Sequence, residues 1–492
     1  MSTALRLVGL LDVLSSTPAE TSRRAPCSHA RLRRLAMKPG ENCGLEVFAV
    51  CYQSYCLHPS SRTAIIDMLG RIGLWFWQGS VKMITRRDLM ISAARLGPLA
   101  GAAFLCNLPV RELLGLSKGS QSVSVQDLLL TAPKARYWIS AAAPGVNCLQ
   151  CHNPKDKLGD PQHHSRGKEP AVKCLLCAQT CVIASGERGK CRARMNVKGE
   201  LRSLVYGRPM ATHVDPIEKK PFYHFLPGSQ AYSMSTSGCP LRCKFCQNWQ
   251  ISQARPEDYD TPFISPASIL SPEVSGTAPV IAFTYNEPTV FAEYLMDIAR
   301  LARKQKRRSV MVSCGFMNPE PLAEMCSVLD AIKIDLKGFD EAFYRNVSSA
   351  ELQPVLRSIK QVARSGIHLE IVNLVVPTLN DSDKMLQALV SWVAGEIGPD
   401  VPIHFTAFHP DYQLLNLPPT PVKTLERARN FALAKGMHYP YAGNVPDHPG
   451  NHTYCPGCNK IVIKRTGFFV VANNLAAGRC KFCNRAIAGV WA

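Results

Sequence analysis

Three cysteines in one short stretch, Cys239, Cys243 and Cys246, constrain this chain more than any other feature. They stand in a Cys-x3-Cys-x2-Cys spacing directly after a short apolar run. Cysteine thiolates hold iron–sulfur clusters, and three of them on one loop leave the fourth iron of a cubane open. An open position distinguishes a catalytic metal site from a closed structural one. A zinc knuckle is the rival, but no fourth Cys or His follows at a short spacing. The loop therefore predicts a catalytic [4Fe-4S] cluster.

Strand-like and helix-like runs alternate along the second half of the chain. The strand-like runs are 231–237, 280–285, 309–315, 331–336, 368–376 and 402–408. The helix-like runs between them include 289–303, 353–364, 382–394 and 421–434. Strands that alternate with helices predict βαβ units around a parallel sheet, which is an α/β fold. Six such units amount to about three-quarters of an eight-fold barrel.

The residues around the three cysteines resemble the cluster loop of radical S-adenosylmethionine (SAM) enzymes. Phe245 matches the aromatic residue that this family places against the adenine of SAM. The resemblance implies a partial (β/α)6 radical SAM barrel over residues 231–445. It also implies that the open iron binds the amino and carboxylate groups of SAM, and that the reduced cluster cleaves SAM to a 5′-deoxyadenosyl radical.

Two more segments extend the resemblance. They are Gly-Glu-Arg-Gly-Lys-Cys-Arg-Ala-Arg at 186–194 and Pro-Ile-Glu-Lys-Lys-Pro-Phe-Tyr-His-Phe-Leu-Pro-Gly-Ser at 216–229. Both resemble the radical SAM enzyme of the AmmeMemoRadiSam system, a relative of the pyruvate formate-lyase activases. The resemblance implies an activating-enzyme-like oxidoreductase that abstracts a hydrogen atom from a protein or peptide and depends on a reductant protein. The alternatives are a small-molecule radical SAM enzyme with an auxiliary cluster and an exported metal-binding or electron-transfer protein.

Polar residues stand at the C-terminal ends of the second and third strand-like runs or directly after them. The chemistry of parallel barrels lies at the C-terminal ends of the strands, so these positions are candidates for cofactor binding. The resemblance assigns Asn286 and Glu287 to the SAM amino group, and it places Ser313 near the ribose or the substrate. The alternative for Asn286 and Glu287 is a helix start, because Asn caps helices well and Glu favours a first turn.

Three charged or titratable residues stand at the C-terminal ends of the fourth and sixth runs or directly after them, and they are the catalytic candidates. The resemblance to the activases puts Lys337 near the SAM carboxylate and Asp335 near the substrate or a bound cation. It also matches His409 to a histidine that lies close to SAM. The alternatives are an ordinary ion pair at a strand end and a structural histidine.

Two groups of four cysteines predict further metal sites. The N-terminal cysteines, with a Cys-x2-Cys-x3-Cys-x9-Cys spacing, are Cys174, Cys177, Cys181 and Cys191. They predict a structural metal or an auxiliary cluster. The tail cysteines, two Cys-x2-Cys pairs within residues 446–492, are Cys455, Cys458, Cys480 and Cys483. They predict a zinc-ribbon-like tail, and the strand-like run 461–471 between the two pairs supports it. A rubredoxin-type iron or an auxiliary cluster is the rival in the tail, because thiolates accept each of them.

Composition excludes some classes of partner. The formal net charge is +20, but the basic residues are scattered and form no stripe with interleaved aromatics, so we expect no nucleic-acid partner. No apolar stretch is long enough for a membrane span. Many of the 20 cysteines fall into pairs and tight groups, which indicates metal ligation rather than a disulfide framework.

The first part of the chain has the pattern of an export signal rather than that of a folded domain. Residues 1–82 lack sustained periodicity and are predicted to be a non-native or disordered extension. Arg86 and Arg87 precede a weakly apolar run, so residues 83–106 resemble a twin-arginine export signal. We therefore expect the natural chain to start at Met83 and to reach the periplasm. The alternative is a basic helix start in a cytoplasmic protein.

A haem site is a further candidate within residues 107–230, which are predicted to hold a linker and the Cys-rich N-terminal module. Cys148 and Cys151 stand in a Cys-x2-Cys-His sequence, which is typical of c-type haem attachment. The competing interpretations are a zinc or cluster site and an unoccupied loop.

Overall fold

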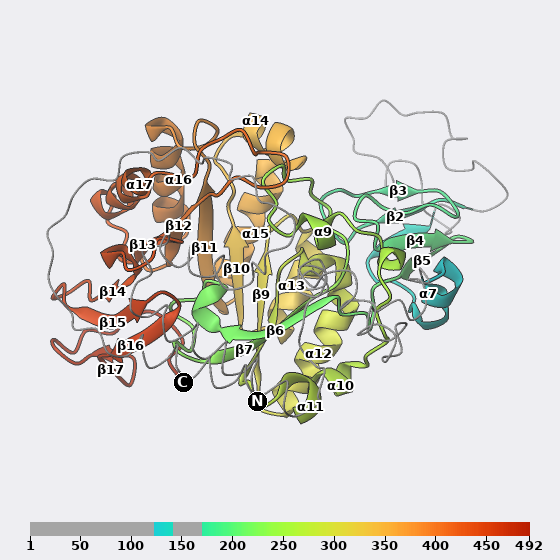
Figure 1. Ribbon diagram of the computed structural model, residues 1–492, viewed down its shortest axis with the longest axis horizontal. Helices are drawn as coiled ribbons and strands as arrows, with labels where there is room; N and C mark the ends of the chain where they lie inside the picture. The colour runs from blue at the N-terminus through green and yellow to red at the C-terminus, as the bar shows by residue number, and fades with distance from the viewer. Residues whose placement is uncertain (1–122, 141–169) are drawn as a thin grey trace, which may run out of the picture. The chain divides into compact units, whose positions relative to one another are not determined.

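The structure is a computed structural model that describes residues 123–140 and 170–492 (Figure 1). The predicted extension 1–82, the predicted signal 83–106 and the cysteines Cys148 and Cys151 lie outside the described residues. Within the described part of the chain, no helix has the length and apolar character needed to cross a membrane.

An eight-stranded sheet forms the centre of the described structure. Its strand order is β13-β12-β11-β10-β9-β8-β7-β6, and the seven strands from β7 to β13 run parallel. Six of them are β7 (Gln230–Ser235), β8 (Val280–Phe283), β9 (Arg308–Ser313), β10 (Ala331–Asp335), β11 (His368–Val375) and β12 (Ile403–Ala407). These are the six strand-like runs of the sequence, so the predicted α/β fold is confirmed. The strands β13 and β6 form the two edges, and the sheet is therefore an open, partial barrel.

Both edge strands were absent from the sequence prediction. The strand β6 (Ala211–Pro216) runs antiparallel to β7 and is largely exposed, so it has no apolar run. The strand β13 (Pro440–Gly443) starts with Pro and ends with Gly, two residues that are depleted in strands. Neither strand therefore carries the signal that identified the other six.

Five helices connect the parallel strands and cover the outer face of the sheet (Figure 1). They are α12 (Ala292–Lys304), α13 (Pro319–Val328), α15 (Leu352–Arg364), α16 (Asp383–Glu396) and α17 (Val422–Ala434). Their buried residues recur at three- and four-residue spacing, as in Leu352, Val355, Ile359 and Val362 of α15. This apolar stripe packs each helix on the sheet, as expected for βαβ units.

The connection between β6 and β7 fills the inner face of the sheet. Phe222 and Phe225 are fully buried and pack against small apolar side chains of β7 to β10. Glu370 of β11 is also fully buried, and it accepts amide hydrogen bonds from Tyr223 at 2.9 Å and from His224 at 2.8 Å. The segment 216–229, which carried part of the family resemblance, therefore fills the interior of the barrel.

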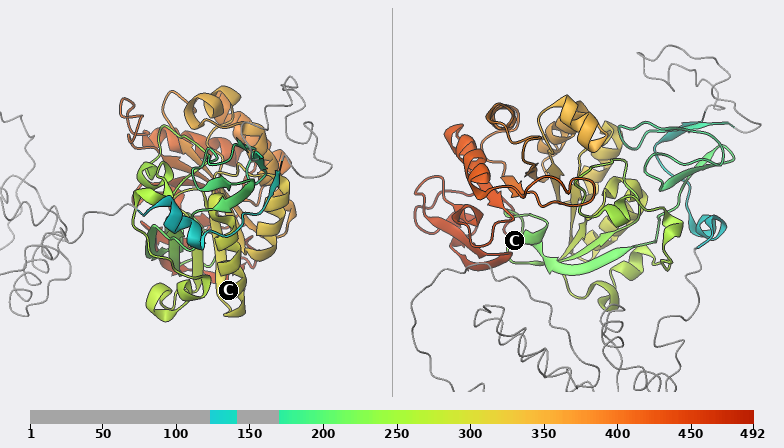
Figure 2. Two further views of the ribbon diagram at one scale, coloured as in Figure 1. Left: turned by 90° about the vertical axis from the view of Figure 1, so that its right-hand side faces the viewer. Right: turned by 45° about the horizontal axis from the view of Figure 1, so that its top comes forward.

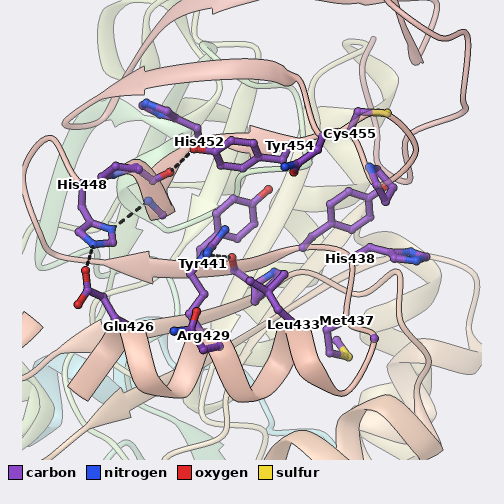
Figure 3. Close-up of a pocket in the computed structure, with 18 of the residues that line it drawn as sticks. Glu426, Arg429, Leu433, Met437, His438, Tyr441, His448, His452, Tyr454 and Cys455 are labelled. Carbon is purple, nitrogen blue, oxygen red and sulfur yellow. Dashed lines mark hydrogen bonds and ion pairs between the residues drawn. The ribbon is translucent and has the colours of Figure 1, made fainter. Parts of the chain in front are cut away.

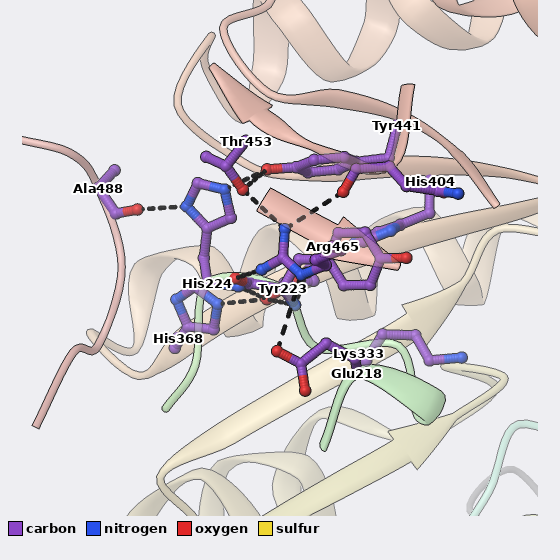
Figure 4. A network of polar contacts seen from close by, with 12 residues as sticks. Glu218, Tyr223, His224, Lys333, His368, His404, Tyr441, Thr453, Arg465 and Ala488 are labelled. Atoms are coloured by element: carbon purple, nitrogen blue, oxygen red, sulfur yellow. Dashed lines mark hydrogen bonds and ion pairs between the residues drawn. The ribbon is translucent and has the colours of Figure 1, made fainter. Parts of the chain in front are cut away.

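A small C-terminal module continues from the barrel. It contains β14 (Thr453–Tyr454), β15 (Ile461–Thr466), β16 (Phe469–Asn473), β17 (Leu475–Ala476) and β18 (Arg479–Cys480). The strand-like run 461–471 is a hairpin of β15 and β16, which turns at Gly467 with a φ of 55°. Arg465 of β15 reaches the connection between β6 and β7, where it donates to the carbonyl of Tyr223 at 2.7 Å (Figure 4).

The Cys-rich N-terminal module lies on the other side of the barrel from the C-terminal module (Figures 1 and 2). Its elements are α7 (Val125–Thr131), β1 (Trp138–Ser140), β2 (Val172–Cys174), β3 (Val182–Ile183), β4 (Arg194–Val197) and β5 (Glu200–Ser203). Arg194 is buried and donates to Glu293 of α12 at 2.5 Å. This buried ion pair joins the module to the barrel.

Candidate active site

The cluster loop, residues 236–248, leaves the C-terminal end of β7 and ends at α9 (Trp249–Ser252). It carries the cluster cysteines, which are Cys239, Cys243 and Cys246. Cys243 is buried, whereas the other two are partly exposed. The three cysteines therefore occupy the end of the barrel where parallel barrels carry their chemistry.

A one-turn π-helix, η5 (Tyr344–Ser348), holds the middle of the cluster loop. The amide of Arg242 donates to the carbonyl of Ser348 at 3.0 Å, and the amide of Lys244 donates to the carbonyl of Val347 at 2.9 Å. Single π-helical turns occur often at functional sites. Sequence spacing gave no signal for this contact, because the two segments are about 100 residues apart.

The environment of Cys239 and Cys243 raises the pKa of both thiols. Burial raises the pKa of the Cys239 thiol, and the Glu287 carboxylate raises it further. Burial also raises the pKa of Cys243, although the nearby Lys337 ammonium acts in the opposite direction. Metal ligands must lose their protons on binding. These thiols therefore need the charge of a bound metal group to become ligands.

Asn286 faces the cluster loop and offers an unused acceptor. Its Nδ2 donates to the carbonyls of Thr236 and Gly238, both at 2.8 Å. Its Oδ1 is buried and has no hydrogen-bond partner. A buried acceptor without a partner is costly, and an ammonium group would satisfy it. The site therefore fits the SAM amino group that the sequence assigned to this residue.

Glu287 connects the end of β8 to the end of β9. Its buried carboxylate accepts from the Ser313 hydroxyl at 2.8 Å and from the Cys314 amide at 2.7 Å. It also accepts from the amide of Thr289 at 3.2 Å. Glu287 is thus the N-cap of η4 (Pro288–Phe291), which agrees with the helix start that the sequence analysis gave as the alternative to SAM binding. Glu287 also lies close enough to Cys239 to raise the pKa of its thiol.

Asp335 and Lys337 form an ion pair at the end of β10. Asp335 lies 2.5 Å from Lys333 and 3.2 Å from Lys337. Burial would raise the pKa of Asp335, but the two ammonium groups outweigh it and bring the pKa to about 2. Burial would lower the pKa of Lys337, but Asp335 and Cys243 raise it well above its ordinary value. The pair is therefore fully charged at neutral pH.

Phe245 is brought next to Lys337. It is buried and stacks on Phe343 with ring centroids 6.4 Å apart. The Lys337 ammonium lies 5.6 Å from the centre of the Phe245 ring. The structure thus gathers the cluster loop, Lys337 and Asp335 at one end of the sheet.

His409 lies apart from these contacts, exposed just after β12. The loop that it begins crosses to the cluster loop, where the amide of Gln413 donates to the carbonyl of Lys244 at 2.9 Å. Tyr412 of this loop stacks on Trp249 with centroids 5.3 Å apart. Neither aromatic residue was singled out in the sequence, because each stands outside any motif.

The N-terminal cysteines meet around one small cavity of about 20 Å³. The module also touches the cluster loop directly. Gly238, with a φ of 92°, lies so close to the carbonyl oxygen of Cys191 that any Cβ there would collide with it. Gln179 donates to the carbonyl of Pro240 at 3.0 Å. The two cysteine-rich segments are therefore neighbours.

The tail cysteines form a compact four-sulfur group. All four Sγ atoms lie within 4.8 Å of one another, with Cys455 and Cys483 at 3.5 Å and Cys458 and Cys480 at 3.7 Å. Four sulfurs at such distances fit a single tetrahedral ion. The predicted metal site of the tail is thus compatible with the geometry.

A cleft of about 1020 Å³ lies between α17 and the C-terminal module (Figure 3). His438, His448, Tyr454 and Cys455 are among the residues that line it. Its lining includes none of the residues that the sequence assigned to SAM. The cleft therefore belongs to a different region from the cluster loop.

Comparisons with known proteins agree with this geometry. The family model described as the radical SAM superfamily matches residues 233–390. The uncharacterized protein MJ0808 of Methanocaldococcus jannaschii is 42% identical over 318 residues, which cover 64% of this chain and 95% of that protein. The pyruvate formate-lyase-activating enzyme of Clostridium pasteurianum is 23% identical over 157 residues, which cover 31% of this chain and 65% of that enzyme.

Solved structures give related matches. A domain of the pyruvate-formate lyase-activating enzyme from Bacteroides vulgatus is 16% identical with a TM-score of 0.31, and the match covers 33% of this chain and 98% of that domain. The resemblance that the cluster loop carried is confirmed by the family model. This chain belongs to the radical SAM superfamily.

Proposed function

We propose that this radical SAM enzyme abstracts a hydrogen atom from a carbon of a protein or peptide. The observation that carries the proposal is the buried, unpaired Oδ1 of Asn286 beside a loop with three cysteines. A protein substrate is supported by the similarity to an activating enzyme, whose name states that it acts on another enzyme. A [4Fe-4S] cluster and SAM, when bound, supply the 5′-deoxyadenosyl radical.

The residues of the site divide the binding of SAM among them. The cluster cysteines would hold the cluster, and Asn286 Oδ1 would accept a hydrogen bond from the SAM ammonium. Lys337 would pair with the SAM carboxylate, and Asp335, 3.2 Å away, favours the charged form of that lysine. Phe245 would lie against the adenine, and Glu287 fixes Ser313 at the neighbouring strand end. His409 begins the loop that closes over the cluster loop.

SAM cleavage is tested by anaerobic reconstitution, reduction with dithionite and chromatography of 5′-deoxyadenosine and methionine. Replacing any one cluster cysteine by Ala is expected to abolish both products. Asn286→Ala should weaken SAM binding at least tenfold, since a hydrogen bond to a charged group contributes about 1.5–3 kcal/mol. Asn248→Ala removes only a donor to the Tyr285 carbonyl and is the matched control. SAM cleavage by a variant that lacks all three cluster cysteines would contradict the proposal.

The class of substrate is tested with deuterium. Lysate from cells grown in deuterated medium is separated into a macromolecular fraction and a low-mass filtrate, and each is incubated with the reduced enzyme and SAM. We expect 5′-deoxyadenosine one mass unit heavier with the macromolecular fraction. If only the filtrate transfers deuterium, the substrate is a small molecule. Because in vivo reduction requires a donor, a reductant protein is the second partner that we propose.

A further inference from the structure

The N-terminal cysteines are built as metal ligands. The backbone amide of Lys190 donates to the Cys181 sulfur at 3.4 Å, and all four cysteines line the same cavity. The rest of its lining combines apolar side chains, among them Leu176, Ile183 and Val290, with the buried Arg194. Four cysteines around one small cavity are a ligand set for a metal group.

The spacing of these sulfurs distinguishes a cluster from a single ion. Zinc–sulfur bonds of about 2.3 Å place the four sulfurs of a zinc site about 3.8 Å apart. The tail cysteines have this compact spacing, and among residues 123–140 and 170–492 no other set of three or more potential ligands lies within 4.8 Å. The N-terminal cysteines share a cavity, but no three of their sulfurs lie within 4.8 Å of one another. A group with several metal atoms fits this wider arrangement.

The position of the site indicates what such a cluster would do. The carbonyl of Cys191 lies against Gly238, which directly precedes the first cluster cysteine. Arg242 of the cluster loop donates to the carbonyl of Lys190, and Gln179 donates to the carbonyl of Pro240. The module therefore touches the cluster loop at three backbone positions, with no intervening domain.

We propose that the N-terminal cysteines bind a second iron–sulfur cluster, which passes single electrons to the cluster of the cluster loop. A low-potential one-electron donor protein reduces the second cluster by one electron. That electron then moves to the catalytic cluster, and the second cluster returns to its oxidised state. No bond forms or breaks in this step.

The first experiment removes the catalytic cluster and asks what remains. The variant with Ala at Cys239, Cys243 and Cys246 is reconstituted anaerobically, and its iron, sulfide and zinc are measured. It should keep about four irons and the electron paramagnetic resonance signal of a reduced cluster, whereas the wild type should hold about eight irons. Changing Cys177 and Cys181 to Ala in that background should remove the remaining iron. An iron-free triple variant, or one with zinc in place of iron, overturns the proposal.

Two controls exclude iron held elsewhere. Replacing Cys148 and Cys151 by Ala in the triple variant should leave its iron unchanged, because these residues are not among the proposed ligands. Replacing Cys480 and Cys483 by Ser should also leave it unchanged. If either control removes the iron, the second cluster does not belong to the N-terminal cysteines.

The relay is tested with two electron donors. For the Cys177→Ala, Cys181→Ala variant with an intact cluster loop, SAM cleavage is measured with reduced flavodoxin and with dithionite. We expect the flavodoxin-to-dithionite rate ratio to fall at least tenfold relative to wild type, because the small reductant reaches the catalytic cluster without the relay. An unchanged ratio shows that electrons enter by another route. Because these readouts depend on metal content and donor, they fail separately from the proposed substrate class.

Discussion

At the scale of single residues, Glu287 combines two tasks that the sequence presented as alternatives. Its carboxylate caps η4 and lies near Cys239, and it also accepts from Ser313 and Cys314. The position after a strand-like run predicted the carboxylate, because that position can be read from local spacing. The partners could not be predicted, since they come from the next strand along the sheet.

Two substitutions of Glu287 separate its structural task from its proposed cofactor task. Glu287→Ala leaves the Cys314 amide without a partner, so it should lower the free energy of unfolding of the metal-free protein by about 1–3 kcal/mol. Glu287→Gln keeps an acceptor oxygen and should retain most of that stability. Loss of the negative charge should nevertheless weaken SAM binding about tenfold in the reconstituted protein. Thermal unfolding and equilibrium dialysis measure the two effects. If the Gln variant binds SAM with wild-type affinity, the charge of Glu287 does not contribute to SAM binding.

At the scale of elements, local spacing predicted more than long-range pairing. The tail cysteines were found because each Cys-x2-Cys pair lies within one turn, and a hairpin joins the two turns. The same hairpin was read as one strand-like run, because β15 and β16 are similar in composition and only Gly467 separates them. The N-terminal cysteines, which spacing alone grouped, line one cavity in the structure, whereas their contact with the cluster loop could be seen only in the fold.

The tail is expected to bind zinc independently of the barrel. Replacing Cys480 and Cys483 by Ser leaves two of the four ligands, so zinc of about one atom per chain should be lost. The metal content of the barrel should not change, because the four tail sulfurs form a ligand group of their own that includes no cluster cysteine. Elemental analysis of wild type and variant measures both quantities. Iron without zinc in aerobically purified wild type would contradict a zinc ribbon.

At the scale of the whole molecule, the buried apolar runs were predictable and the polar links between distant segments were not. Six parallel strands were recognised because their side chains are mostly buried. The exposed β6 lacks that signal, and β13 is buried but begins with Pro and ends with Gly. The connection between β6 and β7 resembled a family motif, but its place inside the barrel followed only from Phe222, Phe225 and the amides that Glu370 binds.

Arg465 joins the C-terminal module to the interior of the barrel, and we expect this link to contribute to the stability of the protein. Its Nε lies 3.7 Å from Glu218, and both side chains are fully buried (Figure 4). Arg465→Ala leaves the Glu218 carboxylate buried without its cation, so it should lower the free energy of unfolding by about 3–5 kcal/mol. Arg465→Met combined with Glu218→Gln removes both charges and should recover more than half of that loss. Arg479→Ala, at an exposed position of the same module, should change stability by less than about 0.5 kcal/mol. Denaturant unfolding followed by Trp fluorescence and by circular dichroism would measure these differences. An unchanged midpoint for Arg465→Ala would mean that the barrel is stable without this link.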